Sequence, residues 1–279
     1  MLTIDPHPTR LTPILLVLGA LTIGCASAPI QPWPAAPSAP DAAQRILAAA
    51  VEEQGGNLFE QVSDLEIAFD GQWGRLAPRI QPVLADKRFR TSSVERYLLQ
   101  EGAVLQRHQG PGGTKTVRRE GPIVRVARNG DVEEDHEDLV TAALVADVYR
   151  MLVTGPSFFQ RDGVELAMGA SDEDHHRLLA FVRPGFGFST EDRVELWIER
   201  ATNHLARVQF TLEGYHPTQG AEVDVKFFDF QRIDGYLWPT RYVERIRRPL
   251  DVFAHRWTLE RVDVSPEEPA DSVLTPLTD

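Results

Sequence analysis

The stretch "DLVTAALVADVYRMLVTGP", residues 138–156, is apolar around nearly its whole circumference when it is wound as a helix. After Asp138 it carries only two charged side chains, Asp147 and Arg150, which stand three residues apart and can pair on one helix face. A helix without a polar face is typically a buried one. Gly155 and Pro156 predict where it ends. We therefore predict a buried central helix that the rest of the chain encloses.

The segments on both sides of this helix alternate apolar and polar residues, as half-buried strands do. Turn sequences such as "RNGD" and "HPTQG" separate these segments, and no repeat period relates them. The clear segments are "LEIAFD" (65–70), "RVELWIER" (193–200), "ARVQFTLEG" (206–214), "AEVDVKFFDFQ" (221–231), "GYLWPTRYVERI" (235–246) and "FAHRWTLERVDV" (253–264). Weaker runs occupy residues 88–108, 114–128, 164–169 and 175–183. Together they predict about eleven or twelve strands.

A second helix is expected at the start of the folded part, in "DAAQRILAAAVEEQGG", residues 41–56. Asp41 can cap it and Gly55-Gly56 can end it, so it should span about residues 41–53. The predicted fold class is thus mainly β (α+β): an antiparallel, half-open barrel with an N-terminal helix and a buried central helix. A sheet of more than about eight strands leaves room inside when it curls, and the central helix fills this room partly or completely.

The N-terminus carries the only cysteine of the 279 residues, Cys25. Before it, residues 11–24 ("LTPILLVLGALTIG") hold no charge. As a helix this run would be about 21 Å long, which is short for a bilayer core of about 30 Å. A polar start, a short apolar run and small residues at its end are typical of a signal peptide. A single thiol cannot form a disulfide within the chain.

The sequence "TIGC" resembles the lipobox of bacterial lipoproteins, with Thr22 where Leu is usual and Leu21 one residue earlier. The resemblance implies that the chain is cut before Cys25, that this cysteine is the site of lipid attachment, and that Ala26 after it directs the protein to the outer membrane of a Gram-negative cell. Two alternatives remain open. One is an ordinary secretory signal cut near "ASA", and the other is a retained membrane helix.

These features divide the chain into a signal peptide (1–24), a Pro/Ala-rich linker after the acylated cysteine (25–40) and one β domain (41–279). The formal net charge of −12 makes nucleic acid an unsuitable partner. The partner that the sequence does predict is the membrane, through the N-terminal lipid. A protein partner is not indicated.

Three parts of the domain carry a further resemblance: the helix that ends in "GG", followed by "VSDLEIAFDG" (62–71), and near the end "DGYLWPTRYVERI" (234–246) and "HRWTLERVDVSPEEPADSVLTPL" (255–277). With them the domain resembles the superfamily of the periplasmic lipoprotein carrier LolA, which includes LolB and RseB-type regulators. The resemblance covers about residues 41–277. It implies the half-barrel and an apolar cavity that takes an acyl chain or a lipoprotein, and no individual binding residue.

We therefore expect a periplasm-facing outer-membrane lipoprotein that binds a lipid or another apolar ligand, without a cofactor and without covalent chemistry. Leu144, Val148 and Leu152 form one stripe of the central helix, which either completes the core or walls a cavity. The residues expected to line the cavity are Leu144, Val148, Leu152, Trp197, Phe210, Phe227 and Trp238.

Two other functions remain open. The first is an envelope scaffold whose core is filled and which acts through its surface. The second is a metal-dependent enzyme that uses "DEDHH", residues 172–176, since clustered His and carboxylate side chains can bind zinc. A catalytic zinc site needs a further ligand at a defined spacing, and the sequence holds no HExxH motif. No metal is therefore expected.

Overall fold

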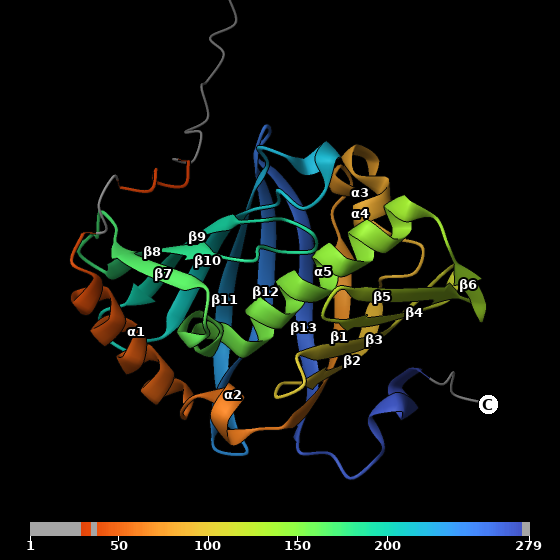
Figure 1. Cartoon of the computed structure of the whole chain (residues 1–279), viewed down its shortest axis with the longest axis horizontal. Helices are drawn as coiled ribbons and strands as arrows, with labels where there is room; N and C mark the ends of the chain where they lie inside the picture. The colour runs from red at the N-terminus through yellow and green to blue at the C-terminus, as the bar shows by residue number, and fades with distance from the viewer. Residues whose placement is uncertain (1–28, 35–37, 275–279) are drawn as a thin grey trace, which may run out of the picture.

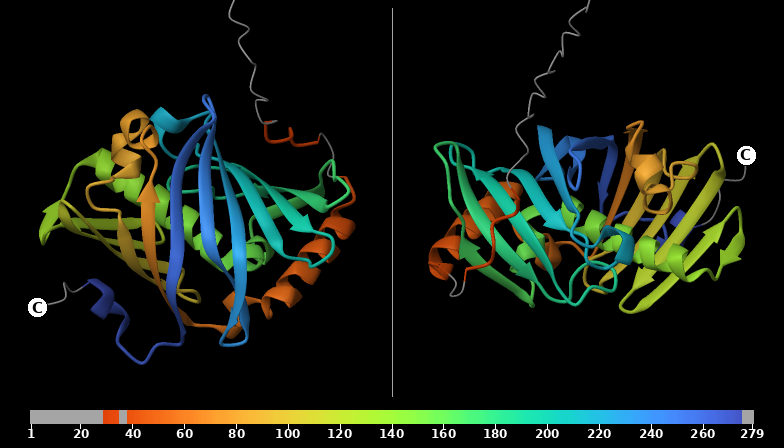
Figure 2. Two further views of the ribbon diagram at one scale, coloured as in Figure 1. Left: turned by 180° about the vertical axis from the view of Figure 1, so that it is seen from behind. Right: turned by 90° about the horizontal axis from the view of Figure 1, so that it is seen from above.

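The computed structural model describes residues 29–34 and 38–274, and within them one antiparallel sheet of thirteen strands curls around a central helix (Figures 1 and 2). The strands follow the order β6-β5-β4-β3-β2-β1-β13-β12-β11-β10-β9-β8-β7. They are β1 (Asp64–Trp73), β2 (Ser92–Leu98), β3 (Ala103–Gly110), β4 (Gly113–Glu120), β5 (Ile123–Arg128), β6 (Asp131–Glu133), β7 (Val164–Met168), β8 (His175–Val182), β9 (Asp192–Glu199), β10 (Leu205–Thr211), β11 (Glu222–Ile233), β12 (Tyr236–Arg248) and β13 (Val252–Val264).

The helices are fewer, and only two of them are long. They are α1 (Pro40–Gln54), α2 (Leu58–Gln61), α3 (Ala77–Ile80), α4 (Pro82–Ala85) and α5 (His136–Thr154), with the 3-10 turns η1 (Gly155–Gln160), η2 (His216–Thr218) and η3 (Ala270–Leu274). The mainly β, half-open barrel predicted from the sequence is confirmed. The sheet has one or two strands more than expected, since an acidic segment before α5 forms the short edge strand β6.

Both predicted long helices are present, with different starts. Helix α5 begins at His136 because the side chain of Asp135 accepts hydrogen bonds from the backbone N–H groups of Glu137 (2.9 Å) and Asp138 (3.3 Å). Helix α1 begins at Pro40, a residue suited to the first turn. Asp41 therefore lies inside the first turn of α1, where its charge suits the helix dipole, and is not its cap.

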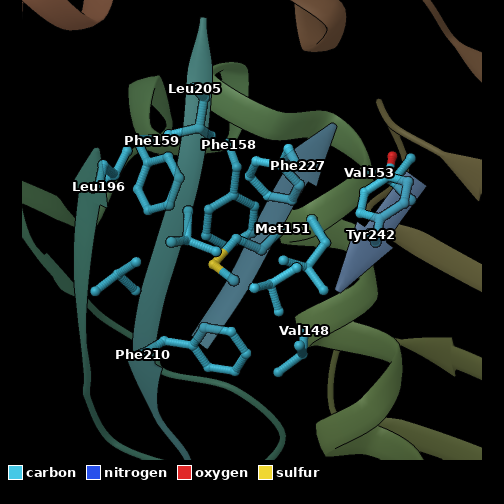
Figure 3. Close-up of a cluster of buried hydrophobic side chains, with 14 of the residues drawn as sticks. Val148, Met151, Val153, Phe158, Phe159, Leu196, Leu205, Phe210, Phe227 and Tyr242 are labelled. Atoms are coloured by element: carbon cyan, nitrogen blue, oxygen red, sulfur yellow. The ribbon is translucent and has the colours of Figure 1, made fainter. Parts of the chain in front are cut away.

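Helix α5 lies in the concave face of the sheet, as predicted for a buried central helix. Its Met151, Leu152 and Val153 are at most 3 % exposed and belong to the main hydrophobic core. Met151 and Val153 lie among aromatic and aliphatic side chains of the strands (Figure 3). The segment His136–Gln160 is the one stretch among the described residues that is long and apolar enough to cross a membrane, and 78 % of its apolar window is buried inside the fold. Its hydrophobicity is thus accounted for by the core.

The predicted linker is partly attached to the convex face of the sheet. The backbone N–H and side chain of Gln31 donate hydrogen bonds to the Glu195 carboxylate of β9 (3.2 and 2.9 Å), and Ile30 is 3 % exposed. Further along, the Trp33 ring meets the Phe181 ring of β8 edge-on at 5.2 Å. Residues 29–34 therefore have a fixed position on the domain. Cys25 and the predicted signal peptide (1–24) lie outside the described residues.

Candidate ligand-binding cavity

The concave side of the half-barrel contains a cavity of about 300 Å³. It lies between α5, the α3–α4 segment and the inward face of β10–β13. Its wall is mostly apolar, and it is closed at the bottom by residues of α5 and open between two loops. The residues that line it include Trp73, Ala77, Ile80, Gln81, Leu84, Ala85, Arg90, Leu144, Val145, Val148, Tyr149, Leu152, Phe210, Leu212, Val223, Glu244, Ile246, Arg248 and Ala254.

Four of the seven residues expected to line a cavity lie on this wall: Leu144, Val148 and Leu152 from α5, and Phe210 from β10. Each is less than 9 % exposed. The helical stripe therefore completes the core on one side and walls the cavity on the other. That these side chains contact a ligand stays a prediction.

The other three expected residues lie elsewhere. Side chains of a strand alternate between its faces, and Leu196 and Ile198 of β9 point into the core, so Trp197 between them points to the convex face. There it lies between the guanidinium groups of Arg177 (5.2 Å) and Arg207 (4.1 Å). The alternation of the sequence already sets Trp197 opposite Val194, Leu196 and Ile198, so its inclusion among the lining residues was wrong.

Phe227 and Trp238 point inward but away from the main cavity. Phe227 lines a separate space of about 30 Å³ near the end of α1. Trp238 is fully buried, and its indole N–H donates to the carbonyl oxygen of Ile233 at 3.3 Å. Both side chains therefore belong to the packed core, where a buried indole has found its hydrogen-bond partner.

One end of the cavity carries charge, which the sequence did not reveal. The guanidinium group of Arg90 stands 5.3 Å from the Trp73 ring and 5.2 Å from the Tyr149 ring, and it donates to the carbonyl oxygen of Leu84 at 2.9 Å. The Trp73 indole N–H in turn donates to the carbonyl oxygen of Arg90. Arg90 is 7 % exposed, so a buried cation is held in place at the cavity wall.

Glu244 of β12 faces the same end. It is half-buried, it lines the cavity, and no cation lies within 4 Å of its carboxylate among residues 29–34 and 38–274. Burial raises the pKa of Glu244 from 4.5 to about 7, although the charge of Arg90 opposes this. Near neutral pH the carboxyl group can therefore donate a hydrogen bond when protonated or accept one when ionised.

His255 pairs with Glu244 across β12 and β13, and its ring stacks on Trp73 with 4.0 Å between centroids. Burial, with the charge of Arg90, lowers the pKa of His255 well below its usual value. His255 is therefore neutral at pH 7. The polar end of the cavity holds one fixed positive charge, from Arg90, and one carboxyl group that titrates near neutrality.

The mouth of the cavity opens between the α3–α4 segment and the loop from β10 to β11. The side-chain amide of Gln81 donates to the carbonyl oxygen of Pro217 at 3.1 Å and links the two sides. Ile80, Gly220 and Arg248 complete the opening. A ligand that enters here meets exposed side chains first and the leucines of α5 last.

The alternative site at residues 172–176 is a turn that leads into β8, whose first two residues are His175 and His176. The Asp172 carboxylate accepts hydrogen bonds from the backbone N–H of His175 at 2.8 Å and from the Arg177 guanidinium at 3.2 Å. His176 lies close to Arg200, 3.3 Å away. Within the described part of the chain, no three His, Cys, Asp or Glu side chains are placed to hold a metal ion. The cluster thus forms local contacts of a turn.

No protein-family description matches this chain, and none of the curated proteins matches it either. Solved structures do match, at low sequence identity. A LolA superfamily protein from Nitrosomonas europaea is 12 % identical, with a TM-score of 0.45 and coverage of 84 % of this chain and 97 % of that one. A DUF1329 family protein from Desulfovibrio piger is 10 % identical, with a TM-score of 0.47 and coverage of 83 % and 96 %.

A putative outer membrane lipoprotein-sorting protein domain from Vibrio parahaemolyticus is also similar, at 10 % identity, a TM-score of 0.43 and coverage of 84 % and 96 %. At such identities no residue role is transferred to this chain, and the site rests on its own geometry.

Sequence reasoning missed Trp73, Arg90 and Glu244. One signal was available for Glu244, since it alternates with Tyr242 and Ile246 and so occupies an inward position of β12. A carboxylate in phase with apolar side chains indicates a polar group in the interior. Arg90 precedes β2 in a segment without periodicity, and nothing in the sequence places it against Tyr149 of α5.

Proposed function

We propose that this protein binds a single acyl chain, or another slender apolar ligand, with the polar end of the ligand beside Arg90 and Glu244. The observation that carries the proposal is the cavity itself: leucine, valine and phenylalanine side chains line much of it, and Arg90 and Glu244 lie at one end. Such a wall matches an amphiphile, because alkyl groups and a polar head meet different parts of it.

The size of the cavity favours one chain over several. Ligand sites in proteins range from about 300 to 1,000 Å³, so this cavity is at the small end of the range. Burial of alkyl surface stabilises the complex by about 25 cal/mol per Å², or about 0.8 kcal/mol for each methylene group. The charged end adds orientation, since a buried arginine is most stable when a ligand oxygen accepts one of its hydrogen bonds.

We further propose that the protein is an outer-membrane lipoprotein on the periplasmic side, anchored through Cys25, with a role in envelope lipid or lipoprotein handling. The support is the apolar run before Cys25, the "TIGC" sequence and Ala26 after it. Stable anchoring needs two or more acyl chains, because one chain alone holds only marginally.

Titration with a fluorescent long-chain fatty acid tests the binding proposal. Val145 lines the cavity and Val140, on the same helix, does not, and both are half-buried. Val145→Phe should lower the affinity for the probe by about tenfold or more by filling the space, whereas Val140→Phe should leave it nearly unchanged. Melting temperatures of both variants show that they remain folded. Failure of the wild-type protein to bind the probe would favour the scaffold function instead.

A further inference from the structure

The mouth of the cavity is surrounded by exposed apolar side chains. Leu76 is 51 % exposed, Ile80 43 % and Leu250 61 %, and these are three of the six large hydrophobic residues that are exposed in the described part of the chain. Ile80 lines the cavity, Leu76 adjoins the lining residue Ala77, and Leu250 follows the lining residue Pro249. Exposed apolar residues gathered at one place indicate an interaction surface.

Arginines accompany them. Arg75, Arg79 and Arg248 are exposed on the same loops, and the first two have no carboxylate within 4 Å in residues 29–34 and 38–274. Arg248 has Glu222 at 3.5 Å. In a protein of net charge −12 this is a local excess of positive charge. We call the six residues Arg75, Leu76, Arg79, Ile80, Arg248 and Leu250 the mouth rim.

The N-terminal segment is fastened to this same place. The backbone N–H of Ile30 donates to the Glu222 carboxylate at 3.2 Å, through the oxygen that faces the Arg248 guanidinium. Glu222 begins β11, directly after the lining residues Gly220 and Ala221. In Figure 1 residues 29–34, the tip of the β12–β13 hairpin and α3–α4 all lie towards the top of the molecule.

The distance from the rim to the lipid attachment site is therefore limited. Cys25 precedes Ile30 by five residues, and five extended residues reach at most about 18 Å. The remainder of the linker cannot lengthen this tether, because residues 30–33 are bound to β11, β9 and β8. A lipid on Cys25 brings the membrane to the side of the molecule that carries the mouth.

We propose that the mouth rim lies against the phospholipid surface in which the Cys25 lipid is anchored, so that the cavity opens towards the membrane. The leucine and isoleucine side chains of the rim then enter the boundary between the lipid headgroups and the acyl chains, and its arginines bind headgroup phosphates. A ligand then passes between bilayer and cavity without crossing water. The inference rests on the proposed lipid attachment at Cys25, and it does not depend on which ligand the cavity takes.

The acylated full-length protein in phosphatidylethanolamine–phosphatidylglycerol vesicles tests this surface. Since Cys25 is the only cysteine and its thiol is acylated, an introduced cysteine is the only free thiol and takes a bimane label. Leu250→Cys and Ile80→Cys place the label on the rim. Ile123→Cys is the matched control, since Ile123 is 51 % exposed. The pairing of β5 with β4, β4 with β3, β3 with β2 and β2 with β1 places Ile123 at the end of the sheet where β1 begins. The mouth rim lies at the opposite end, where β1 ends.

Nitroxide-labelled phospholipids should quench the label at positions 80 and 250 by about twofold or more and leave the label at position 123 nearly unchanged. Equal quenching at all three positions, or none at the rim, would overturn the proposal. The proposal would also be overturned if labelled palmitate were incorporated into a lipoprotein control and not into the wild-type protein. The readout needs no ligand, so a failure here is separate from a failure of the fatty-acid titration.

Discussion

The two halves of the concave face are equally buried and differ in chemistry. On one side of α5, strands β8–β11 and η1 contribute Leu196, Phe210 and Phe158, all at most 1 % exposed. On the other side, strands β2–β4 contribute Glu95, Gln106 and Lys115, at most 3 % exposed. One half is stabilised by apolar area and the other by hydrogen bonds and ion pairs.

The polar half is closely connected. The Glu95 carboxylate accepts hydrogen bonds from Ser93 (2.7 Å), Gln106 (2.9 Å) and the Tyr97 hydroxyl. Even so, burial raises the pKa of Glu95. Lys115 donates to the Asp86 carboxylate at 2.7 Å. Buried polar groups of this kind are tolerated only when they are paired, which makes this half sensitive to the loss of any one partner.

The cavity lies where the two halves meet. Leu144 and Phe210 reach it from the apolar side, and Arg90 and Glu244 reach it from the side of the polar groups. Its amphipathic wall is therefore a consequence of the uneven sheet. A half-barrel can thus form a site for an amphiphile when its inner face changes from apolar to polar from one set of strands to the next.

Removal of a charged partner should have the largest effect. The Asp147 carboxylate accepts from the Arg119 guanidinium (3.2 Å) and from the backbone N–H of Gly187 (2.9 Å), and Arg150 lies 3.7 Å away, as the spacing in the sequence predicted. Asp147→Ala should lower the free energy of unfolding by about 3–5 kcal/mol, because a buried cation loses its partner.

Asp147→Asn is the control for this substitution, since the amide oxygen can still accept from Gly187 and only the charge is lost. Urea denaturation measures both variants. A loss below about 1 kcal/mol for Asp147→Ala would mean that water satisfies Arg119 and that the two halves differ less than the burial indicates.

Truncation in the apolar half should cost somewhat less. Leu144 is fully buried, and Leu144→Ala should destabilise the fold by about 2–5 kcal/mol. The lower part of this range is expected, because one side of the leucine already faces the cavity and loses fewer contacts. Thermal unfolding with and without a bound fatty acid measures this loss of stability. A loss larger than that of Asp147→Ala would mean that the apolar half is more sensitive to substitution than the polar half.

Enlargement separates packed from open positions on α5. Ala146 is fully buried and does not line the cavity, so Ala146→Leu should cost about 1–3 kcal/mol through overpacking. Val145→Leu adds its methylene group next to the open space and should change stability little while it weakens binding of the fatty-acid probe. Equal destabilisation by both changes would show that the cavity has no room for one methylene group.

The smallest effect concerns pH. Because the pKa of Glu244 is about 7 in the folded protein and 4.5 ordinarily, the folded state holds the proton more tightly, and wild-type stability falls as pH rises from 4.5 to 7. Glu244→Gln has no such loss. The melting temperature of Glu244→Gln minus that of the wild type should rise by several degrees over this interval and then level off. A difference that is constant between pH 4.5 and 8 would contradict the assignment.

The same contrast explains how much the sequence could predict. Alternation found β9 and β10 easily, because their inward positions are apolar. Strands β2, β3 and β4 gave only weak runs, because their inward positions hold residues such as Glu95, Gln106 and Lys115, which a periodicity test reads as exposed. The central helix and the half-barrel were predicted, and with them four side chains of the cavity wall.

The polar end of the cavity could not be predicted in this way. Its arrangement depends on contacts between Trp73 of β1, Arg90 and Tyr149 of α5, which lie far apart in the chain. Local sequence patterns carry no information on contacts between residues that are so far apart in the chain. The attachment of Ile30 to Glu222 is of the same kind, since a proline-rich segment indicates an extended chain and not the surface on which it rests.

An open sheet of thirteen strands, unlike a closed barrel, has two free edges, and free edges invite other chains to pair with them. One edge, β6, has only three residues, two of them acidic, and Asp135 and its neighbours continue the negative charge into α5. The other, β7, is occupied: the Met168 N–H donates to the carbonyl oxygen of Ser38 at 2.9 Å, and α1 packs against the strand. A short acidic edge and a covered edge together protect this protein from edge-to-edge aggregation.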